Sequence, residues 1–404
     1  MNFVFISPHF PANVWQYCRA LKENGVNVLG VADAPWEELS PELQASLSDY
    51  YRVGSLENRD EMVRALGWFT YKYGKIDWLE SNNEYWLEQD AWLRRAFYIT
   101  SGPQPERMRR DRRKSSMKDA YARAGIATAP YALPENVDQA LAFAARVGYP
   151  LVVKPDSGVG AQGTYRLNDE EQLRHFFANL PPLPYIMEPY VFGEICSYDA
   201  IVDSRGEPLF ESGNITRGSI MDFVNERQDC VFYIPPRPAD DLVEAGRRCL
   251  KAWDVRSRSI HFEFFRLSRD QKGLGNAGDL VGLEVNLRPS GGLSADMINY
   301  AGSVDVYRMW ADMICHDRVF LNDQRQRYYC VFVGRRDWKH YLHPHHQLLH
   351  DWASRIVMQE RTPRALADTM GEQAYLLRCG SREEMDAFLD YALKTTEQPR
   401  TQGG

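Results

Sequence analysis

The sequence lacks the features that mark several common classes of protein. No apolar run reaches the roughly 18 residues that a membrane span requires, and no charged leader precedes the first predicted strand at Asn2. The 404 residues carry a net charge of −7, which argues against a general nucleic-acid binder. The seven cysteines never form a CxxC pair, which argues against a zinc site or a disulfide framework. We therefore expect a cytoplasmic protein with reduced thiols and neither a nucleic-acid nor a membrane partner.

The remaining composition is that of a globular protein, and the first hundred residues alternate strands with helices. Hydrophobic residues make up 44% and charged residues 25%, and the length allows two or three domains, each with a core of its own. Apolar runs at 2–7, 26–33 and 75–81 read as strands, with a helical segment between the first two. This alternation predicts a parallel sheet, so residues 1–103 are interpreted as a small α/β domain.

The pattern changes after a polar, strongly basic stretch, which on its own reads as a solvated linker. Residues 104–320 carry mostly strands with few helices, which predicts an α+β domain with antiparallel pairing. One helix is expected over 294–316. We expect residues 321–396 to form a small C-terminal α+β segment and residues 397–404 to form a disordered tail.

The segment LVVKPDSGVGAQGTYRL, residues 151–167, suggests a phosphate site. Lys154 ends an apolar strand, and Gly158, Gly160 and Gly163 follow it before strand-like sequence resumes. Glycines let a backbone approach an anion closely and turn its N–H groups toward it. The segment is neither a Walker loop nor a dinucleotide fingerprint. The alternative reading is a lysine at a strand edge that faces water.

The segment YIMEPYVFGEICSYDAIVD, residues 185–203, resembles a hinge that could bind a nucleoside. An apolar strand ends at Glu188, and Tyr190 and Val191 could offer backbone groups to the edge of a purine. Glu194 could accept hydrogen bonds from ribose hydroxyls. The alternative is a hinge with two exposed acids.

Two strands carry polar side chains that are costly to bury without partners. Glu284, Asn286 and Arg288 alternate, so all three point to one face of a strand. Glu263 stands among aromatic residues in the strand HFEFFRL. Carboxylate and amide oxygens are ligands that Mg²⁺ prefers, and Arg288 beside them could hold a carboxylate or a leaving phosphate. A structural Glu–Arg pair is the alternative.

Together, and in this order, these motifs resemble the ATP-grasp superfamily. The resemblance covers residues 105–315 and is closest to the branch with biotin carboxylase, the carbamoyl-phosphate synthase large chain and the carboxylate–amine ligases. It implies an α/β N-terminal domain followed by an α+β ATP-grasp fold, in which two subdomains clamp ATP. The cofactors implied are ATP and Mg²⁺, with Mn²⁺ as an alternative metal.

The resemblance also implies roles for individual residues. Nucleotide contacts are implied with phosphate for Lys114, Lys154, Gly158, Gly160 and Gly163, with adenine for Glu188, Tyr190 and Val191, and with ribose for Glu194. Metal ligation is implied for Glu263, Glu284 and Asn286. A catalytic role is implied for Arg288 together with Lys154. This chain departs from the pattern at His261, where related dipeptide ligases have an arginine, and no biotin-attachment sequence is present.

The activity that the resemblance implies is that of a carboxylate–amine ligase. ATP would convert a small-molecule carboxylate to an acyl phosphate, and an amine or other nitrogen nucleophile would displace phosphate. An ATP-grasp phosphotransferase and a non-catalytic nucleotide-binding regulator are the alternatives. Arg217, Arg227 and Arg288 are candidates for substrate binding. A homodimer is one alternative for the oligomeric state, and the histidines at 341–350 are interpreted as the start of an exposed helix.

Overall fold

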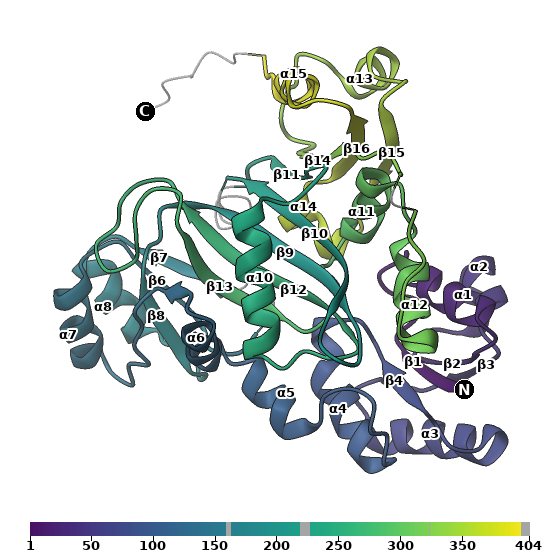
Figure 1. Cartoon of the computed structure of the whole chain (residues 1–404). Coiled ribbons are helices and arrows are strands. Elements are labelled where there is room, and N and C mark those ends of the chain that lie inside the picture. Colours follow the sequence, from purple (N-terminus) through teal and green to yellow (C-terminus); the bar gives the residue numbers. More distant parts are fainter. Residues whose placement is uncertain (159–162, 219–226, 323, 397–404) are drawn as a thin grey trace.

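A four-stranded parallel sheet forms the N-terminal domain of the computed structural model, which describes residues 1–158, 163–218, 227–322 and 324–396 (Figure 1). Its strands run in the order β3-β2-β1-β4. They span β1 (Asn2–Ile6), β2 (Asn27–Ala32), β3 (Asp49–Arg52) and β4 (Trp78–Glu80). Helices α1 (Trp15–Glu23), α2 (Pro41–Ser46) and α3 (Arg59–Tyr73) and the 3₁₀ turn η1 (Trp36–Glu38) connect the strands, and the 3₁₀ turn η2 (Glu84–Trp86) and helix α4 (Leu87–Ala96) follow β4. The parallel α/β domain predicted from the sequence is thus present.

The basic stretch after this domain is helical and not an extended linker. It forms α5 (Pro105–Asp111) and α6 (Lys114–Arg123). Asp156, at the end of a neighbouring strand, accepts hydrogen bonds from the backbone N–H of Ser115 at 2.8 Å and from its hydroxyl at 2.9 Å. A carboxylate at a helix N-terminus satisfies N–H groups that have no partner inside the helix. Asp156 therefore fixes the start of α6 against the strand that carries Lys154.

A small lobe follows, built on three antiparallel strands in the order β7-β6-β8. It contains β6 (Leu151–Pro155), β7 (Tyr165–Leu167) and β8 (Tyr185–Pro189), with helices α7 (Val137–Val147) and α8 (Glu170–Ala178) on one side (Figure 1). The segment that follows Lys154 therefore connects two antiparallel strands, as the sequence predicts.

The central sheet has nine strands in the order β15-β16-β14-β11-β10-β9-β12-β13-β5. Its first six strands along the chain are β5 (Ala127–Thr128), β9 (Gly193–Val202), β10 (Pro208–Arg217), β11 (Cys230–Ile234), β12 (Arg258–Leu267) and β13 (Leu280–Asn286). Helix α10 (Asp240–Ala252) packs on one face, where a Cβ on Gly246 would lie 2.2 Å from the ring of Tyr198. The opposite face is left for the polar side chains described below.

The single helix expected over 294–316 is wrong, because the structure contains two helices there. They are α11 (Ser294–Gly302) and α12 (Val306–His316). Ser303 adopts a left-handed φ of 49°, and Asp305 caps α12 by accepting from the backbone N–H of Arg308. Trp310 of α12 packs edge-on against Phe3 at a ring distance of 5.6 Å, so α12 joins the N-terminal sheet to the central sheet (Figure 1).

The C-terminal residues extend the central sheet. They form β14 (Tyr329–Arg335), β15 (Ile356–Arg361) and β16 (Gln373–Cys379), with helices α13 (His345–Asp351), α14 (Arg364–Met370) and α15 (Arg382–Leu393). Antiparallel pairing of β14 with β11 makes the sheet continuous across the boundary predicted between residues 320 and 321. The tail predicted at 397–404 lies outside the described residues.

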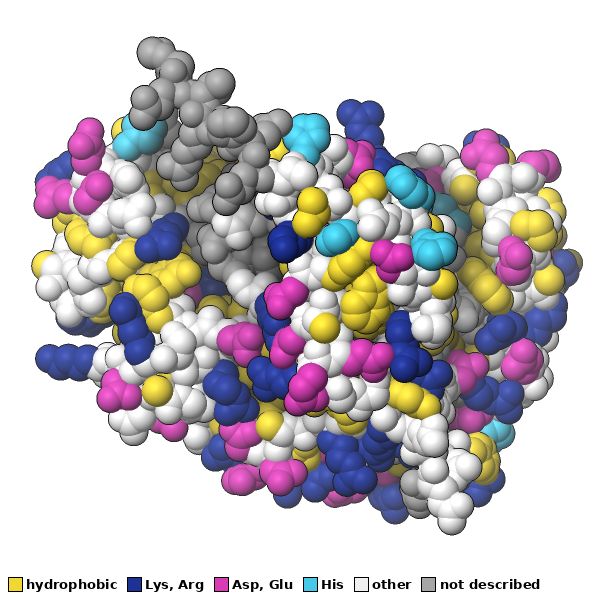
Figure 2. Space-filling view, turned by 90° about the horizontal axis from the view of Figure 1, so that it is seen from above, with side chains coloured by type: hydrophobic (Ala, Val, Ile, Leu, Met, Phe, Trp, Pro, Cys, Tyr) yellow, Lys and Arg dark blue, Asp and Glu magenta, His cyan; other side chains and the backbone are white. Residues whose placement is uncertain are grey.

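Three further findings concern membrane spans, cysteines and surface charge. In the part of the chain that the structure describes, no helix is long and apolar enough to cross a bilayer. All seven cysteines are free thiols. Basic and acidic side chains are mixed over the described residues of the face in Figure 2.

Candidate active site

Glu188 and Lys154 form the centre of a buried ion cluster in the small lobe. Lys154 Nζ lies 2.7 Å from one carboxylate oxygen of Glu188, and Lys118 contacts the other oxygen. All three side chains are at most 8% exposed. Burial alone would raise the pKa of Glu188, but the two lysines outweigh it and lower that pKa to about 2. Glu188 is therefore ionised, and its side chain faces the lysines.

Helix α6 supplies two of the lysines from one face. Lys114 and Lys118 are four residues apart, so their side chains are neighbours on the helix. Lys114 Nζ lies 3.7 Å from Glu284 on the central sheet, whereas Lys118 reaches Glu188 on β8. Burial lowers the pKa of Lys118, with Glu188 opposing part of this effect. Helix α6 thus carries positive charge to both sheets.

The glycine segment after Lys154 is only partly described. Gly163 has a φ of +71°, and a Cβ there would lie 3.2 Å from the Pro155 ring, so this position favours glycine. Gly158 has ordinary space around it. Gly160 lies outside the described residues.

Glu263 and Glu284 occupy directly opposed positions on the antiparallel strands β12 and β13. A β-bulge follows Glu263. The hydroxyl of Tyr121, on α6, lies 2.9 Å from the backbone carbonyl oxygens of both residues. A Cβ on Gly282 would lie 2.5 Å from the ring of Tyr121, so glycine is needed for this approach. Helix α6 thereby fixes the backbone that presents the two carboxylates.

His261 forms a bridge between two carboxylates on the same sheet face. Its Nδ1 lies 2.7 Å from Asp199 on β9, and its Nε2 lies 2.9 Å from Glu263. Burial disfavours the charged ring, but Asp199 and Glu263 outweigh it and raise the pKa of His261 to about 10. Both ring nitrogens therefore donate, and the imidazolium ion neutralises the carboxylates beside it. Asp199 also accepts from the Ser197 hydroxyl at 2.7 Å.

The pKa values of Glu263 and Glu284 are shifted in opposite directions. Burial would raise the pKa of Glu263, yet the hydrogen bond from His261 lowers it. For Glu284, burial raises the pKa, and the charge of Glu263 adds to the rise against the opposing effect of Lys114. A second cation between the two carboxylates would relieve this repulsion.

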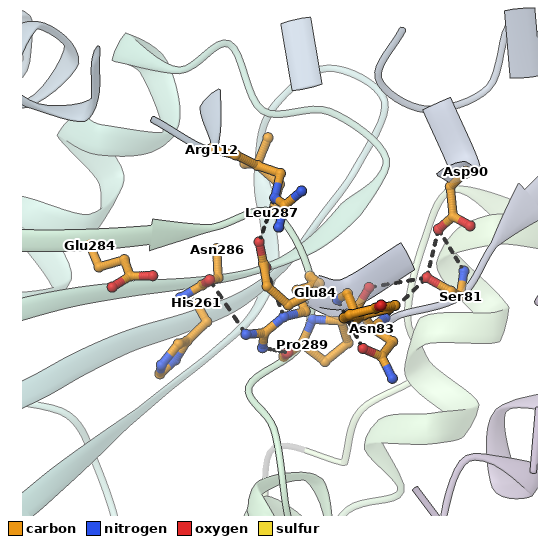
Figure 3. Close-up of polar contacts among 12 residues, drawn as sticks. Ser81, Asn83, Glu84, Asp90, Arg112, His261, Glu284, Asn286, Leu287 and Pro289 are labelled. Atoms are coloured by element: carbon orange, nitrogen blue, oxygen red, sulfur yellow. Dashed lines mark hydrogen bonds and ion pairs between the residues drawn. The ribbon is translucent and has the colours of Figure 1, made fainter. Parts of the chain in front are cut away.

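Asn286 and Arg288 extend the same row beyond Glu284. Asn286 pairs in register with His261, so the two side chains share a face. Arg288 Nη2 lies 3.4 Å from the Asn286 amide oxygen, and its Nε lies 3.1 Å from Glu84 of the N-terminal domain. Glu84 also accepts from Arg112 Nε at 3.0 Å. Figure 3 shows Glu84 grouped with Arg112, Leu287 and Pro289.

The donor set fits a hard divalent cation that also binds phosphate. Within the described ranges, no three His, Cys, Asp or Glu side chains come together as a preformed metal site. Glu263 and Glu284 face one another with the Asn286 amide one step along the strand, and all three donate oxygen. A Mg²⁺ ion commonly takes one or two protein carboxylates and completes its shell with water and phosphate oxygens. The residues present therefore fit Mg²⁺ bound together with a phosphorylated ligand.

The segment after β8 carries the other predicted nucleotide contacts. The backbone N–H of Tyr190 donates to the Pro150 carbonyl at 2.9 Å, and the guanidinium of Arg166 lies 4.5 Å from the centre of the Tyr190 ring. Val191 is buried. The side chain of Glu194 is exposed, and partial desolvation raises its pKa, with Arg217 opposing.

Arg217 and Arg227 are paired with acids of the C-terminal part of the chain. Arg217 Nη2 lies 2.5 Å from Asp386, and Arg227 Nη2 lies 2.7 Å from Glu372. The structure does not bring either into the row formed by Glu263, Glu284, Asn286 and Arg288.

The histidine-rich segment begins an exposed helix, as predicted, because α13 starts at His345 and the side chains of His345, His346 and His350 are exposed. His345 Nδ1 lies 2.8 Å from the Tyr375 hydroxyl, and His343 stacks on Tyr391 at a ring distance of 3.6 Å. Several histidines lie on the face in Figure 2.

Sequence reasoning missed several residues that complete the site. They are Glu84, Arg112, Lys118, Tyr121 and Asp199. The four-residue spacing of Lys114 and Lys118 was a usable signal, as was the alternation of Ser197 with Asp199. Nothing in the local sequence indicated Glu84, whose partner Arg288 lies 204 residues away.

Comparison with known proteins finds local matches to a family model and to a curated relative. Residues 111–180 match the ATP binding domain of the carbamoyl-phosphate synthase L chain. Biotin carboxylase from Pseudomonas aeruginosa is 39% identical over 84 residues, which are 20% of this chain and 19% of that protein. The match thus spans about a fifth of the relative.

Solved structures match along almost the whole chain. An L-amino acid ligase from Bacillus licheniformis has a TM-score of 0.72 at 16% identity, covering 98% of this chain and 99% of that one. N5-carboxyaminoimidazole synthetase from Staphylococcus aureus, complexed with ADP, has a TM-score of 0.67 at 15% identity, covering 96% of each chain. The biotin carboxylase domain dimer of the Hydrogenobacter thermophilus 2-oxoglutarate carboxylase, solved with MgADP, ADP and bicarbonate, has a TM-score of 0.68 at 17% identity, covering 96% and 89%. These matches show that this chain shares their fold.

Proposed function

We propose that this chain, which has the ATP-grasp fold of these ligases, is itself an ATP-dependent carboxylate–amine ligase. It would activate a small-molecule carboxylate as an acyl phosphate and join it to an amine or another nitrogen nucleophile, releasing ADP and phosphate. The observation that carries this proposal is the row of Glu263, Glu284 and Asn286 on one face of the central sheet, with Arg288 beyond the end of β13 in contact with Asn286. Lys114 approaches that row from α6.

Similar proteins support the same reading. The matched family model is an ATP binding domain, and one of the matched structures was solved with MgADP. Several of the matched proteins are named as ligases or synthetases. We extend ATP and Mg²⁺ to this chain on that basis, with Mn²⁺ as an alternative metal.

The first step would transfer phosphate to the carboxylate. A carboxylate oxygen attacks the γ-phosphorus of ATP, the new O–P bond forms, and the bond to ADP breaks. Lys114 and Lys154 would neutralise phosphate charge, which is the main task of a protein in phosphoryl transfer. Gly158 and Gly163 flank the segment assigned to the phosphates. Mg²⁺, held by Glu263, Glu284 and Asn286, would neutralise charge on the phosphate oxygens.

The second step would form the C–N bond. The nitrogen attacks the carbonyl carbon of the acyl phosphate, phosphate leaves with the C–O electrons, and the proton lost by the nitrogen is taken up by the released phosphate. Arg288 would stabilise the negative charge that develops on oxygen, because a guanidinium offers several N–H donors in one plane. Neither step requires a nucleophilic side chain, so positioning and charge neutralisation carry the reaction.

The nucleoside would lie between the two sheets. We assign Tyr190 and Val191 to the adenine edge and Glu194 to the ribose hydroxyls. Glu188 is assigned as the counter-charge of Lys118 and Lys154, because its carboxylate is buried between them.

A small cavity of about 30 Å³ lies beside this row and is lined by Tyr17, Asp199, Ser259, Pro289, Ser290 and Ala295, among others. It adjoins the His261–Asp199 pair and the residue that follows Arg288 in the chain. This volume is enough for about one water molecule and not for an acid or amine substrate. We also propose that the substrates are small molecules, that the protein is cytoplasmic and that it forms a homodimer.

An ADP-release screen of acids paired with amines tests the proposal. A ligase releases ADP and free phosphate only when both partners are present, and the product contains a new C–N bond by mass spectrometry. Phosphate retained on a hydroxyl acceptor would identify a phosphotransferase instead. ATP binding without turnover across the screen would indicate a regulator.

A further inference from the structure

Glu84 connects the N-terminal domain to the proposed catalytic arginine. It lies in η2, just beyond β4, and its side chain is 10% exposed. One carboxylate oxygen lies 3.1 Å from Arg288 Nε and the other lies 3.0 Å from Arg112 Nε. Arg112 also contacts Glu88 at 2.8 Å, on the solvent side of the same network. Arg288 is therefore held from outside the sheet that carries it.

Arg288 keeps two N–H groups that have no hydrogen-bond partner among the described residues. An arginine has five N–H groups. Among the described residues, Nε donates to Glu84, Nη1 donates to the Pro289 carbonyl at 2.7 Å, and Nη2 donates to Asn286 at 3.4 Å. One N–H remains on each terminal nitrogen. Because Nη2 lies beside Asn286, the N–H group that remains on Nη2 adjoins the proposed metal and phosphate site.

A buried ion cluster fixes the distance between the segments that carry Glu84 and Arg288. We call it the Glu80 cluster; it consists of Glu80, Arg94 and Arg258. Arg258 donates to the Leu287 carbonyl at 2.6 Å and to Glu80 at 2.6 Å, and Arg94 Nη2 lies 2.8 Å from Glu80. Leu287 directly precedes Arg288, and Glu80 ends β4 four residues before Glu84.

The backbone at Gly102 packs closely against the Glu80 cluster and leaves no room for a side chain. Gly102 has a φ of +88°, and a Cβ there would lie 2.7 Å from Arg94 Nε and 3.1 Å from Arg258 Nη2. The three charged side chains are at most 6% exposed. Close packing and low exposure make this junction rigid.

We propose that Glu84 is a positioning residue for Arg288, and this rests on the proposed ligase function. By holding Nε, Glu84 keeps the guanidinium oriented with the remaining N–H on Nη2 available to a carboxylate or acyl phosphate oxygen. The N-terminal domain thus controls the geometry of the catalytic row. Glu84 itself does not contact the reacting atoms.

Glu84→Gln and Glu88→Gln form a matched pair for testing this role. Both acids contact Arg112, but only Glu84 contacts Arg288. With an acid–amine pair that supports turnover, we expect Glu84→Gln to lower kcat roughly ten- to hundredfold, since small misplacements of a catalytic group are costly. The KM for MgATP should stay within about twofold, because Arg288 is not an adenine or ribose contact. Inhibition by inorganic phosphate should weaken in parallel. Glu88→Gln should match the parent protein in all three measurements.

The outcomes separate this proposal from the proposed function. If the parent protein turns over and both variants behave alike, the positioning role is wrong while the ligase function stands. If the parent protein turns over no acid–amine pair, the ligase function fails first. Should Glu84→Gln not fold, Glu84→Asp keeps the charge but shortens its reach. A kcat for Glu84→Asp equal to that of the parent protein would overturn the proposal, whereas a loss in kcat with unchanged KM for MgATP would support it.

Discussion

Glu263 and Glu284 face each other across β12 and β13, held by a common contact of their backbone carbonyls with the Tyr121 hydroxyl. Two carboxylates in this position repel each other unless cations lie near them. His261 neutralises Glu263, and Lys114 lies 3.7 Å from Glu284. The pair is thus prepared for one more cation, which is the basis of the proposed metal site.

Glu284→Gln should reduce ADP formation at least about a hundredfold while the fold is retained, because the amide removes a charged ligand from the proposed metal site. ADP release and circular dichroism measure the two effects. Glu170→Gln, at a carboxylate that is 59% exposed on α8, is the control and should leave both unchanged. Turnover by Glu284→Gln at the parent rate would refute the metal assignment.

Lys154→Ala should weaken ATP binding by at least about tenfold, since it removes a charge-assisted contact to phosphate. It should also destabilise the fold by about 3 kcal/mol, because Glu188 loses one of its two buried partners. Combining it with Glu188→Gln should lower stability further, because Lys118 would then be buried without its counter-charge. Calorimetric titration with ATP and urea unfolding provide the measurements, and unchanged ATP affinity in Lys154→Ala would contradict the phosphate assignment.

The acid stability of the protein should depend on Glu188. Its pKa is lowered from 4.5 to about 2 in the fold, so its contribution to the free energy of unfolding is present above the unfolded pKa. That contribution is lost as pH falls from about 4.5 to about 2, and amounts to roughly 3 kcal/mol. Urea midpoints measured between pH 5 and 3 should therefore fall less steeply in Glu188→Gln than in the parent protein. Parallel slopes in the two proteins would argue against an ionised Glu188.

Tyr121→Phe should lower stability by about 1–2 kcal/mol, because buried carbonyl oxygens lose their donor. We also expect a lower kcat, since the backbone at the bulge that presents Glu263 and Glu284 becomes less constrained. Tyr300→Phe is a suitable control, because the Tyr300 hydroxyl makes only a 3.4 Å contact with the Val357 carbonyl. Steady-state kinetics and thermal unfolding test both effects, and equal kcat in the two variants would exclude a role for Tyr121 in the site.

Local sequence determined the parts of the site that depend on strand geometry. Because side chains alternate along a strand, the spacing of Glu284 and Asn286 was enough to place them on one face, whereas Arg288, predicted on the same face, lies beyond the end of β13. The glycines after Lys154 likewise predicted a connection between antiparallel strands. The order of an α/β domain before an antiparallel region also followed from periodicity, and the structure confirms it.

Tertiary structure alone decided which groups from distant segments meet these residues. Periodicity reports the face of a helix or strand but not what packs against it, so the approach of Lys118 to Glu188 and of Glu84 to Arg288 was not readable from the chain. The same reason explains the pairing of β14 with β11, which joins the predicted C-terminal segment to the central sheet. The sequence thus specified the reactive side chains, whereas long-range packing specified the charges that surround and orient them.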